Sequence, residues 1–279
     1  MSARSTAKVV VQKVDAEGIR PRSDRLVAEE PLEVRVRSNG RSETAAVTMR
    51  TPGSDFELAA GFLFSEGVVR DRTSLARIDY CSDVADEQLY NVVTVHVAEG
   101  AGVDVRPLER HFHISSACGV CGKTSIEALE TRGVSPVSET ASVPAGIIAT
   151  LPGKLRESQS VFDATGGPHA AGLFTADGGS VAVREDVGRH NAVDKVVGWA
   201  LLEGRVPFEG GILVVSGRAS FEIVQKAAAA GIPVVCAVSA PTNLAVSTAE
   251  RFGVTLIGFL RGAQFNVYTH ADRIEVGTA

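Results

Sequence analysis

Two cysteines three positions apart are the residues of this chain best suited to chemistry. Cys118 and Cys121 lie in the segment Ser115–Glu127, in which Thr124 and Glu127 have the spacing of a helix capping box. We therefore expect Cys121 just before the amino terminus of a helix, where free N–H groups and the helix dipole favour an anion. Because the thiolate is the reactive form of cysteine, this setting predicts a reactive thiol.

Two other uses of these cysteines stay open on the sequence alone. Structural zinc usually takes four ligands, and His111 and His113 could complete such a set with the cysteine pair. A thioredoxin-type dithiol has the same spacing, although it belongs near the start of a βαβ unit, which the flanking sequence does not clearly show. The alternatives to a reactive thiol are thus a zinc-stabilised binding module and a CxxC dithiol oxidoreductase.

Two polar segments further along the chain are candidates for ligand binding. Phe162–Ala171 contains a Gly-Gly-Pro turn, which would let a ligand approach the backbone, although a plain helix-to-strand turn would look the same. Arg184–Asn191 concentrates charge, which suits either a phosphate-bearing or heteroaromatic ligand or a charge-paired helix start. The candidate residues are Thr165, Gly166, Gly167, His169, Arg184, Arg189 and His190.

Three further polar segments each follow an apolar, strand-like run. They are Ser216–Ser220, Ser239–Asn243 and Arg261–Gln264. Sites in parallel sheets lie beyond the carboxyl ends of the strands, so we expect these segments to cluster on one edge. N–H groups ahead of helices could hold phosphates there, and Arg218 and Arg261 could neutralise charge. Together the segments predict an anionic, nucleotide-like ligand.

The elements that must position these residues fall into two parts. The first part mixes strands with one helix, because apolar residues alternate with polar ones in two stretches and recur at helical spacing in a third. Its expected features are a charged loop at Arg20–Arg25, a strand at Leu32–Val36, a hairpin turn at Asn39–Gly40, a returning strand at Ala45–Met49, a helix with a Ser54–Glu57 capping box that Gly67 ends, and a strand at Asn91–Val97.

The second part alternates short helices with short apolar strands after a connector rich in Ser, Pro and Gly at Ser135–Pro152. This rhythm predicts an α/β fold with a mainly parallel sheet that helices cover on both faces. The expected elements are strands at Ala171–Thr175 and Val181–Arg184, a helix at Arg189–Leu202, a strand at Gly211–Val215, a helix at Phe221–Ala230, a strand at Ile232–Val238, a helix at Leu244–Phe252 and a strand at Val254–Leu260.

The composition and net charge of the chain argue against several classes of function. The 279 residues are 44% hydrophobic with a formal net charge of −5, which argues against a general affinity for nucleic acid or anionic membranes. No apolar run is long enough for a transmembrane helix, and Met1–Glu17 lacks the apolar core of a secretory signal. The four cysteines are therefore expected to be reduced thiols in the cytoplasm, with Cys81 and Cys236 as ordinary small core or half-buried residues.

The motifs, taken in order, resemble those of the FdhD family, the sulfur-carrier accessory proteins of formate dehydrogenases. The resemblance runs nearly end to end, and several long motifs in one order make a chance match improbable. The matching segments are Arg50–Gly53, Gly61–Gly67, Ser116–Gly122, Asp163–His169, Glu185–Lys195, Ser216–Arg218 and Ser239–Thr242.

The resemblance implies a fold of two regions. Residues 1–134 would form a smaller, mixed β-rich region that ends in the CxxC loop and its helix, and residues 135–279 a cytidine-deaminase-like three-layer domain. The zinc signature of the deaminases, His-x-Glu with Pro-Cys-x-x-Cys, is absent from this sequence. Deaminase chemistry and its zinc are therefore not expected.

The resemblance also implies a sulfurtransferase role. Cys118 would accept persulfide sulfur from a cysteine desulfurase and deliver it to the bis-guanine-dinucleotide molybdenum cofactor, which is then inserted into formate dehydrogenase. Whether Cys121 stabilises the thiolate, relays sulfur or forms a disulfide stays open. The cofactor is expected to be a bound client, the protein to be a homodimer, and nucleic acid and membranes not to be partners.

The predicted cofactor-binding residues combine the family's stretch with the polar segments above. The resemblance places the stretch at the final strand end, at Phe259, Leu260, Arg261, Gly262, Ala263 and Gln264. The residues that the polar segments add are Ser216, Gly217, Arg218, Thr165, Gly166, Gly167, His169, Arg189 and His190.

Overall fold

The computed structural model describes residues 5–82, 90–101, 126–127, 129–130, 133–138 and 142–276. The cysteine pair, Cys118 and Cys121, lies outside the described residues, and so do His111 and His113. Of the helix predicted to follow the pair, residues 126–127 and 129–130 are described and are helical.

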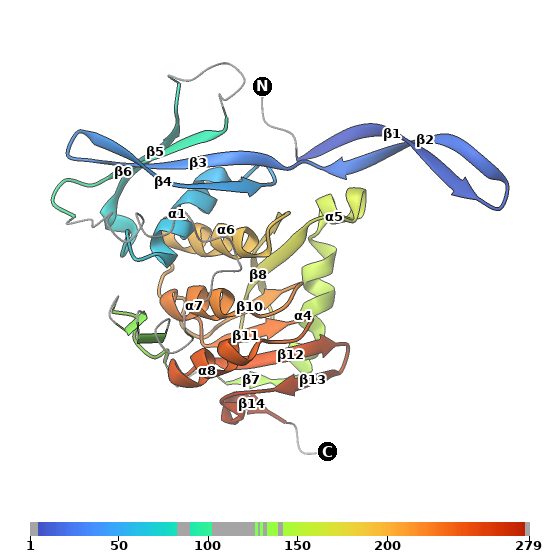
Figure 1. Ribbon diagram of the computed structural model, residues 1–279. Helices are drawn as coiled ribbons and strands as arrows, with labels where there is room; N and C mark the ends of the chain where they lie inside the picture. Colours follow the sequence, from blue (N-terminus) through green and yellow to red (C-terminus); the bar gives the residue numbers. More distant parts are fainter. Residues whose placement is uncertain are drawn as a thin grey trace.

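A four-stranded sheet forms much of the amino-terminal part, in the order β4-β3-β6-β5 (Figure 1). The predicted alternation is confirmed, since Leu32, Val34 and Val36 are all buried on one face of its second strand. The predicted turn is confirmed too, because Asn39 and Gly40 both have positive φ, at 49° and 77°. The elements are β3 (Glu30–Ser38), β4 (Arg41–Arg50), β5 (Leu75–Tyr80), β6 (Val92–Val97), the helix α1 (Asp55–Ser65) and a short 3-10 turn at Arg72–Ser74.

The capping box predicted at the start of α1 is wrong. Ser54 adopts a left-handed conformation, with φ of 56°, and its side chain caps no N–H group. The Glu57 carboxylate instead receives two hydrogen bonds from Arg184, at 2.5 and 2.7 Å. A bidentate pair with a guanidinium is a stronger interaction than a reciprocal cap, so the tertiary contact prevails over the local one.

A six-stranded sheet organises the carboxy-terminal part, in the order β13-β12-β11-β10-β8-β9. The strands predicted from apolar runs are present, but the prediction of a mainly parallel sheet is wrong, since only β10-β11 and β11-β12 are parallel. β9 and β13 join the sheet through hairpins, which force antiparallel pairing, and β8 also pairs antiparallel with β10 although β9 and α6 lie between them in the chain. The strands are β8 (His169–Thr175), β9 (Ser180–Asp186), β10 (Gly211–Val215), β11 (Val234–Ala237), β12 (Thr255–Arg261) and β13 (Gln264–Val267), with a small parallel pair β7 (Val143–Pro144) and β14 (Ile274–Glu275) apart from them.

Helices cover both faces of this sheet, as predicted. One face packs on α6, α7 and α8, and the other packs on α4 (Figure 1). Alternate residues of β10 accordingly enter two separate cores, Leu213 and Val215 in one and Ile212 and Val214 in the other. The helices are α4 (Ala145–Glu157), α5 (Ser160–Thr165), α6 (Arg189–Leu202), α7 (Phe221–Ala229) and α8 (Asn243–Arg251), with a 3-10 turn at Ala271–Arg273.

The two parts of the chain meet where α1 lies against α6. A Cβ atom on Gly61 of α1 would overlap the carbonyl oxygen of Asp194, and one on Gly198 of α6 would overlap that of Glu57. The helices therefore touch backbone to backbone, and only glycine permits this approach. Side chains from both parts share the larger of the two cores, for example Leu63 and Val197.

A long ribbon of two strands leaves the body of the protein (Figure 1). It consists of β1 (Thr6–Asp15) and β2 (Gly18–Val27), which pair over ten residues. The charged loop predicted at Arg20–Arg25 is wrong, because those residues belong to β2. Charges gave the segment a loop-like sequence, yet every one of these side chains is exposed, so a strand can carry them.

Candidate functional site at the strand-end edge

The three polar segments follow the carboxyl ends of the neighbouring parallel strands β10, β11 and β12, so they lie on one edge of the sheet, as predicted. The Gly217 oxygen accepts from the Ser239 N–H at 3.4 Å, and the Ser239 oxygen accepts from the Phe259 N–H at 3.1 Å. Ala219 also forms an isolated parallel bridge with Pro241. Because β10, β11 and β12 run parallel, their carboxyl ends emerge side by side, and the segments that follow them form one edge.

Three predicted site residues from separate segments meet at this edge. A Cβ atom on Gly217 would lie 3.4 Å from His169 Nδ1 and 3.8 Å from Arg189 Cδ. His169 begins β8 and Arg189 begins α6, so the meeting depends on how β8 and α6 lie beside β10. The absence of a side chain at Gly217 leaves the histidine and the arginine uncovered on that side.

The basic side chains of this trio are those of Arg189 and His169. Arg189 Nε is buried and has no hydrogen-bond partner in the described part of the chain. Burial, and then the positive charge of Arg189, lowers the pKa of His169 below its ordinary value. A neutral imidazole beside an unsatisfied guanidinium N–H is suited to receive an anionic group.

His190 is held between two side chains at the start of α7. Its Nε2 lies 3.0 Å from Ser220 Oγ, and its Nδ1 lies 3.0 Å from Glu222 Oε2. Burial, and then the charges of Arg189 and Lys226, lower the pKa of His190 to about 3. Glu222 is half exposed, so solvent screens its charge and the ring is neutral near pH 7. The histidine is therefore a neutral hydrogen-bonding group there, and the lowered pKa makes it a weak proton acceptor.

A buried ion pair supports the segment that carries Arg189. Lys195 Nζ lies 2.7 Å from Asp186 Oδ2 and donates to the Thr51 oxygen at 2.9 Å. Asp186 also accepts from the N–H groups of Thr51 and Gly188, at 3.1 and 2.8 Å. This network ties the end of β4 to the turn before α6, and so fixes where α6 begins.

The glycine-rich turn before β8 has a structural explanation for most of its residues. The Thr165 hydroxyl donates to the Val161 oxygen at 2.7 Å and accepts from the Gly167 N–H at 3.3 Å, so it is used within the turn. Gly166 ends α5 in the left-handed region, with φ of 68°. A Cβ on Gly167 would lie 2.7 Å from Val27 Cγ1, so this glycine permits close packing against β2. Of this segment, only His169 joins the trio.

The remaining predicted residues lie at the same edge or just beyond it. Ser216 Oγ accepts from the Ala170 N–H at 2.9 Å, and Arg218 is exposed. Phe259 has a positive φ of 54° within a register shift of the β12–β13 pair, whereas the Leu260 side chain is fully buried in the core. Arg261, Gly262, Ala263 and Gln264 form the exposed turn that follows. No distance links this turn directly to the trio.

Sequence reasoning missed several residues of the site. Arg184 was expected to bind an anion, but Glu57 already occupies its guanidinium. Ser220 and Glu222 hold His190, and Thr51 and Lys195 hold Asp186. Three of these four lie inside segments noted in the sequence and Glu222 lies just beyond one, but none was given a role, because partners from distant elements leave no spacing to recognise.

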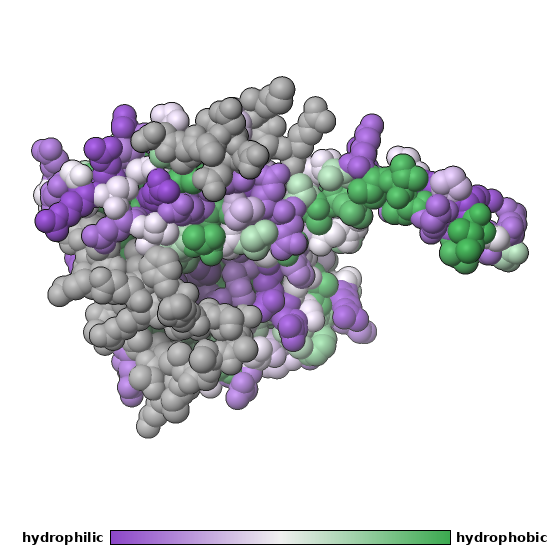
Figure 2. All heavy atoms as spheres, turned by 45° about the horizontal axis from the view of Figure 1, so that its top comes forward, coloured by the Kyte–Doolittle hydropathy of each residue, from purple (hydrophilic) through white to green (hydrophobic). Residues whose placement is uncertain are grey.

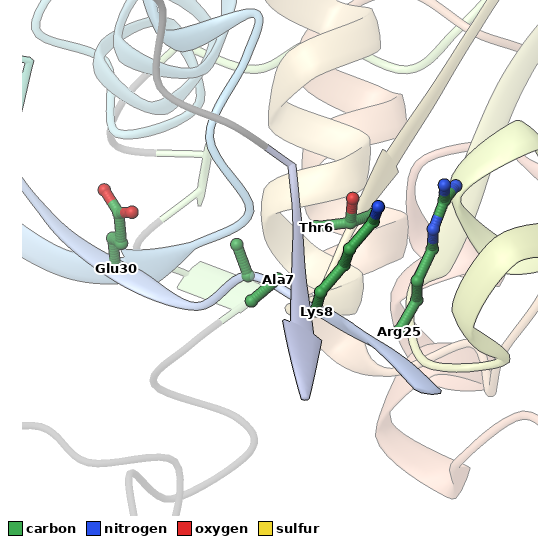
Figure 3. Close-up of a pocket in the computed structure, with 6 residues that line it drawn as sticks. Thr6, Ala7, Lys8, Arg25 and Glu30 are labelled. Atoms are coloured by element: carbon green, nitrogen blue, oxygen red, sulfur yellow. The ribbon is translucent and has the colours of Figure 1, made fainter. Parts of the chain in front are cut away.

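A separate hollow of about 580 Å³ lies at the base of the ribbon (Figure 3). Its lining includes Lys8 and Arg25, which are paired directly across the two strands and point to the same side in Figure 3. None of the predicted site residues that the structure describes lines it. The described residues contain no group of three or more His, Cys, Asp or Glu that could hold a metal ion, and no described helix is long and apolar enough to cross a membrane.

Comparison with known proteins shows the family to which this chain belongs. The family model described as FdhD/NarQ matches residues 27–275, so the chain belongs to the FdhD/NarQ family.

Its relatives carry a more particular description. The chain is 54% identical to a protein named sulfur carrier protein FdhD from Mycolicibacterium paratuberculosis, over 91% of this chain and 93% of that one. It is 51% identical to the Streptomyces coelicolor protein of the same name, over 99% and 98%. The fold is also similar, with a TM-score of 0.75 and 24% identity, to a crystal structure of a protein described as a formate dehydrogenase accessory protein from Desulfotalea psychrophila, over 97% and 99%.

Proposed function

We propose that this protein is a sulfurtransferase that carries sulfur for the maturation of formate dehydrogenase. The observation that carries the proposal is the match, over nearly the whole chain, to relatives named sulfur carrier protein FdhD. The sequence supplies the two thiols that such a role needs, at Cys118 and Cys121. We expect the protein to work in the cytoplasm and as a homodimer, and its carboxy-terminal sheet to be related to that of cytidine deaminases.

The transfer proceeds in two steps. The Cys118 thiolate attacks the outer sulfur of a persulfide on a cysteine desulfurase, and the desulfurase thiolate leaves with the electrons of the broken S–S bond. The resulting persulfide on Cys118 then gives its terminal sulfur to the bis-guanine-dinucleotide molybdenum cofactor, the substrate of the second step. The S–S bond breaks with its electron pair on Cys118, and the reduced cofactor supplies the two electrons that convert the transferred sulfane sulfur to sulfide. Cys118 is released as a thiol or thiolate for another cycle.

The strand-end edge supports the binding of that substrate. Guanine dinucleotides carry phosphate charge, and Arg189 offers a buried N–H group without a partner in the described part of the chain. A Cβ on Gly217 would lie against His169, so the glycine leaves room beside that ring, and neutral His190 adds no further charge to the edge. We propose that one guanine nucleotide of the cofactor binds over Gly217, with its phosphates toward Arg189.

Sulfur loading tests the proposal directly. The purified chain is incubated with a cysteine desulfurase and cysteine, and its intact mass is measured. We expect added sulfur that reducing agent removes, and we expect Cys118→Ala to abolish the transferable fraction. Cys81→Ala changes another cysteine and should load normally. Full activation of formate dehydrogenase by the Cys118→Ala protein would refute the proposal.

A zinc-binding module and a dithiol oxidoreductase remain the alternatives. Stoichiometric zinc in the purified protein, together with unfolding by a chelator, would favour the first. Reduction of a disulfide substrate that depends on both cysteines would favour the second.

A further inference from the structure

The start of α7 holds a row of three polar side chains to which the transfer steps above give no role. Glu222 Oε2 lies 3.0 Å from His190 Nδ1, and His190 Nε2 lies 3.0 Å from Ser220 Oγ. None of the large apolar side chains that the described residues expose belongs to residues 216–222, whereas Figure 2 shows such side chains along the β1–β2 ribbon. A ligand at the start of α7 is therefore recognised mainly through polar groups.

Glu222 fixes which nitrogen of His190 carries the proton. A neutral imidazole has one N–H group and one ring nitrogen with a free lone pair. A lone pair on Nδ1 would face the Glu222 carboxylate at 3.0 Å and be repelled by it, so the proton lies on Nδ1. Nε2 then presents its lone pair to Ser220, and the hydroxyl of that serine donates its only proton to the ring.

This arrangement makes Ser220 a hydrogen-bond acceptor toward any ligand. Its side chain caps no N–H group of α7, and within the described part of the chain its oxygen accepts no hydrogen bond, so its lone pairs stay available. Glu222 Oε1 likewise accepts no hydrogen bond from the described residues, and the glutamate side chain is 49% exposed. The start of α7 thus presents two acceptors, which suit a ligand with two neighbouring donors.

These acceptors lie beside the trio of His169, Arg189 and Gly217. Ser220 follows Gly217 by three residues in one segment, and His190 follows Arg189 directly. Burial lowers the pKa of His190, and the charges of Arg189 and His169 add to the effect, so the ring is within electrostatic reach of both. A nucleotide whose phosphates approach Arg189 can therefore bring its base to the start of α7.

We propose that the start of α7 recognises a guanine base, with Ser220 Oγ and the Glu222 carboxylate accepting from its ring N1–H and exocyclic amino groups. His190 is a positioning residue, which holds the Ser220 proton away from the base. This rests on the proposed function, because it names the part of the nucleotide-bearing substrate that the edge would distinguish. Adenine has a lone pair instead of a donor at the same ring position, so it fits two acceptors less well.

Calorimetric titration with guanosine and adenosine diphosphates tests the recognition. We expect the wild type to bind the guanosine diphosphate at least about tenfold more tightly, since a hydrogen bond to a charged acceptor accounts for a factor of that size. Glu222→Ala should abolish this preference and Ser220→Ala should reduce it about fivefold, while both keep their affinity for adenosine diphosphate. Glu250→Ala and Ser247→Ala are matched substitutions further along α8 and should keep the wild-type preference.

The position of the His190 proton is measured without any ligand. Nitrogen NMR spectroscopy of the free protein with labelled histidine should show a protonated Nδ1 and an unprotonated Nε2. Glu222→Ala should move the proton toward Nε2, because the carboxylate that holds it on Nδ1 is gone. Glu250→Ala removes a glutamate that lies 4.0 Å from His270, and should leave the His190 signals unchanged.

The outcomes separate this inference from the proposed function. A proton on Nε2 in the wild type, equal affinities for the two nucleotides, or a preference that neither Glu222→Ala nor Ser220→Ala reduces would overturn the recognition of guanine and leave the nucleotide site in place. If neither nucleotide bound to the wild type, the nucleotide site itself would be refuted, and the recognition of guanine with it.

Discussion

At the scale of single residues, the candidate site depends on one arginine with an unmet hydrogen bond. Arg189 Nε is buried and unpartnered among the described residues, and Gly217 leaves its side chain open. A buried donor without a partner costs about 1–3 kcal/mol, and a ligand oxygen would recover part of that cost. Among the described residues, the Arg189 Nε–H group is therefore a donor that a bound ligand oxygen could satisfy.

Guanosine diphosphate is the simplest probe of this arginine. We expect Arg189→Met to weaken its binding at least about tenfold in calorimetry, because a charge-assisted hydrogen bond to phosphate contributes about 1.5–3 kcal/mol. Arg77→Met removes an exposed arginine elsewhere and should bind as the wild type does. Equal affinities for all three proteins would contradict the proposed orientation of the nucleotide.

His190 should make the stability of the fold depend on pH. Its pKa is about 3 in the folded protein and near 6.5 in an unfolded chain, so between these values only the unfolded state binds the proton. The stabilising contribution is complete above about pH 6.5 and is lost as the pH falls, at about 1.4 kcal/mol per pH unit.

Urea unfolding at pH 7 and at pH 5 measures this contribution. From pH 7 to pH 5, the unfolding free energy of the wild type should fall by up to about 2 kcal/mol relative to that of His190→Gln. His270→Gln is the matched substitution outside the site. If His270→Gln removed the same pH dependence of the unfolding free energy, the effect could not be assigned to His190.

Sequence reasoning found the residues of this site unevenly, for a physical reason. His169, Arg189 and Gly217 stood out because their types suit an anionic ligand, and they do meet. Gly166 and Gly167 stood out equally, yet the end of a helix and the proximity of Val27 explain them. A glycine that allows a turn and a glycine that admits a ligand look identical until the neighbours are known.

At the scale of elements, the contact between α1 and α6 tolerates no side chain at its centre. Gly198→Ala should destabilise the fold by at least about 3 kcal/mol, because the new methyl group overlaps the backbone of Glu57 and the helices must separate. Gly146→Ala, in α4, meets nothing within 4 Å and should be neutral or slightly stabilising. Chemical unfolding of both variants measures the difference, and a mild effect at Gly198 would show that the helices can move apart.

Most elements were predictable from sequence, whereas their pairing was not. The connector expected at Ser135–Pro152 is wrong, because β7 and most of α4 lie within it, and Pro152 stands inside that helix. Apolar runs marked β10, β11 and β12, and glycines marked the ends of the helices between them. The direction of the outer strands depends on hairpin connections that apolar periodicity does not encode, so the sheet was wrongly expected to be mainly parallel. The β1–β2 ribbon was missed because β2 is exposed along nearly its whole length, and an exposed strand has no buried face to leave an alternating pattern.

At the scale of the whole molecule, one core joins the two parts of the chain. Leu63 and Val197 belong to the same buried cluster, and Lys195 holds Thr51 across the junction. We therefore expect a single cooperative unfolding transition in calorimetry, with equal calorimetric and van't Hoff enthalpies. Two resolved transitions would instead favour the predicted division into residues 1–134 and 135–279 as independent units.

The thiol of the buried Cys236 is a built-in probe for opening of the fold. Its side chain is fully enclosed between sheet and helix, and burial raises the pKa of its thiol. An alkylating reagent can therefore reach it only when the sheet opens, so its labelling rate in native buffer records how often the interior is breached. A persulfide on Cys236 would likewise identify chains that had opened. In a sulfur-loading experiment, such chains can therefore be told apart from chains that carry sulfur on Cys118.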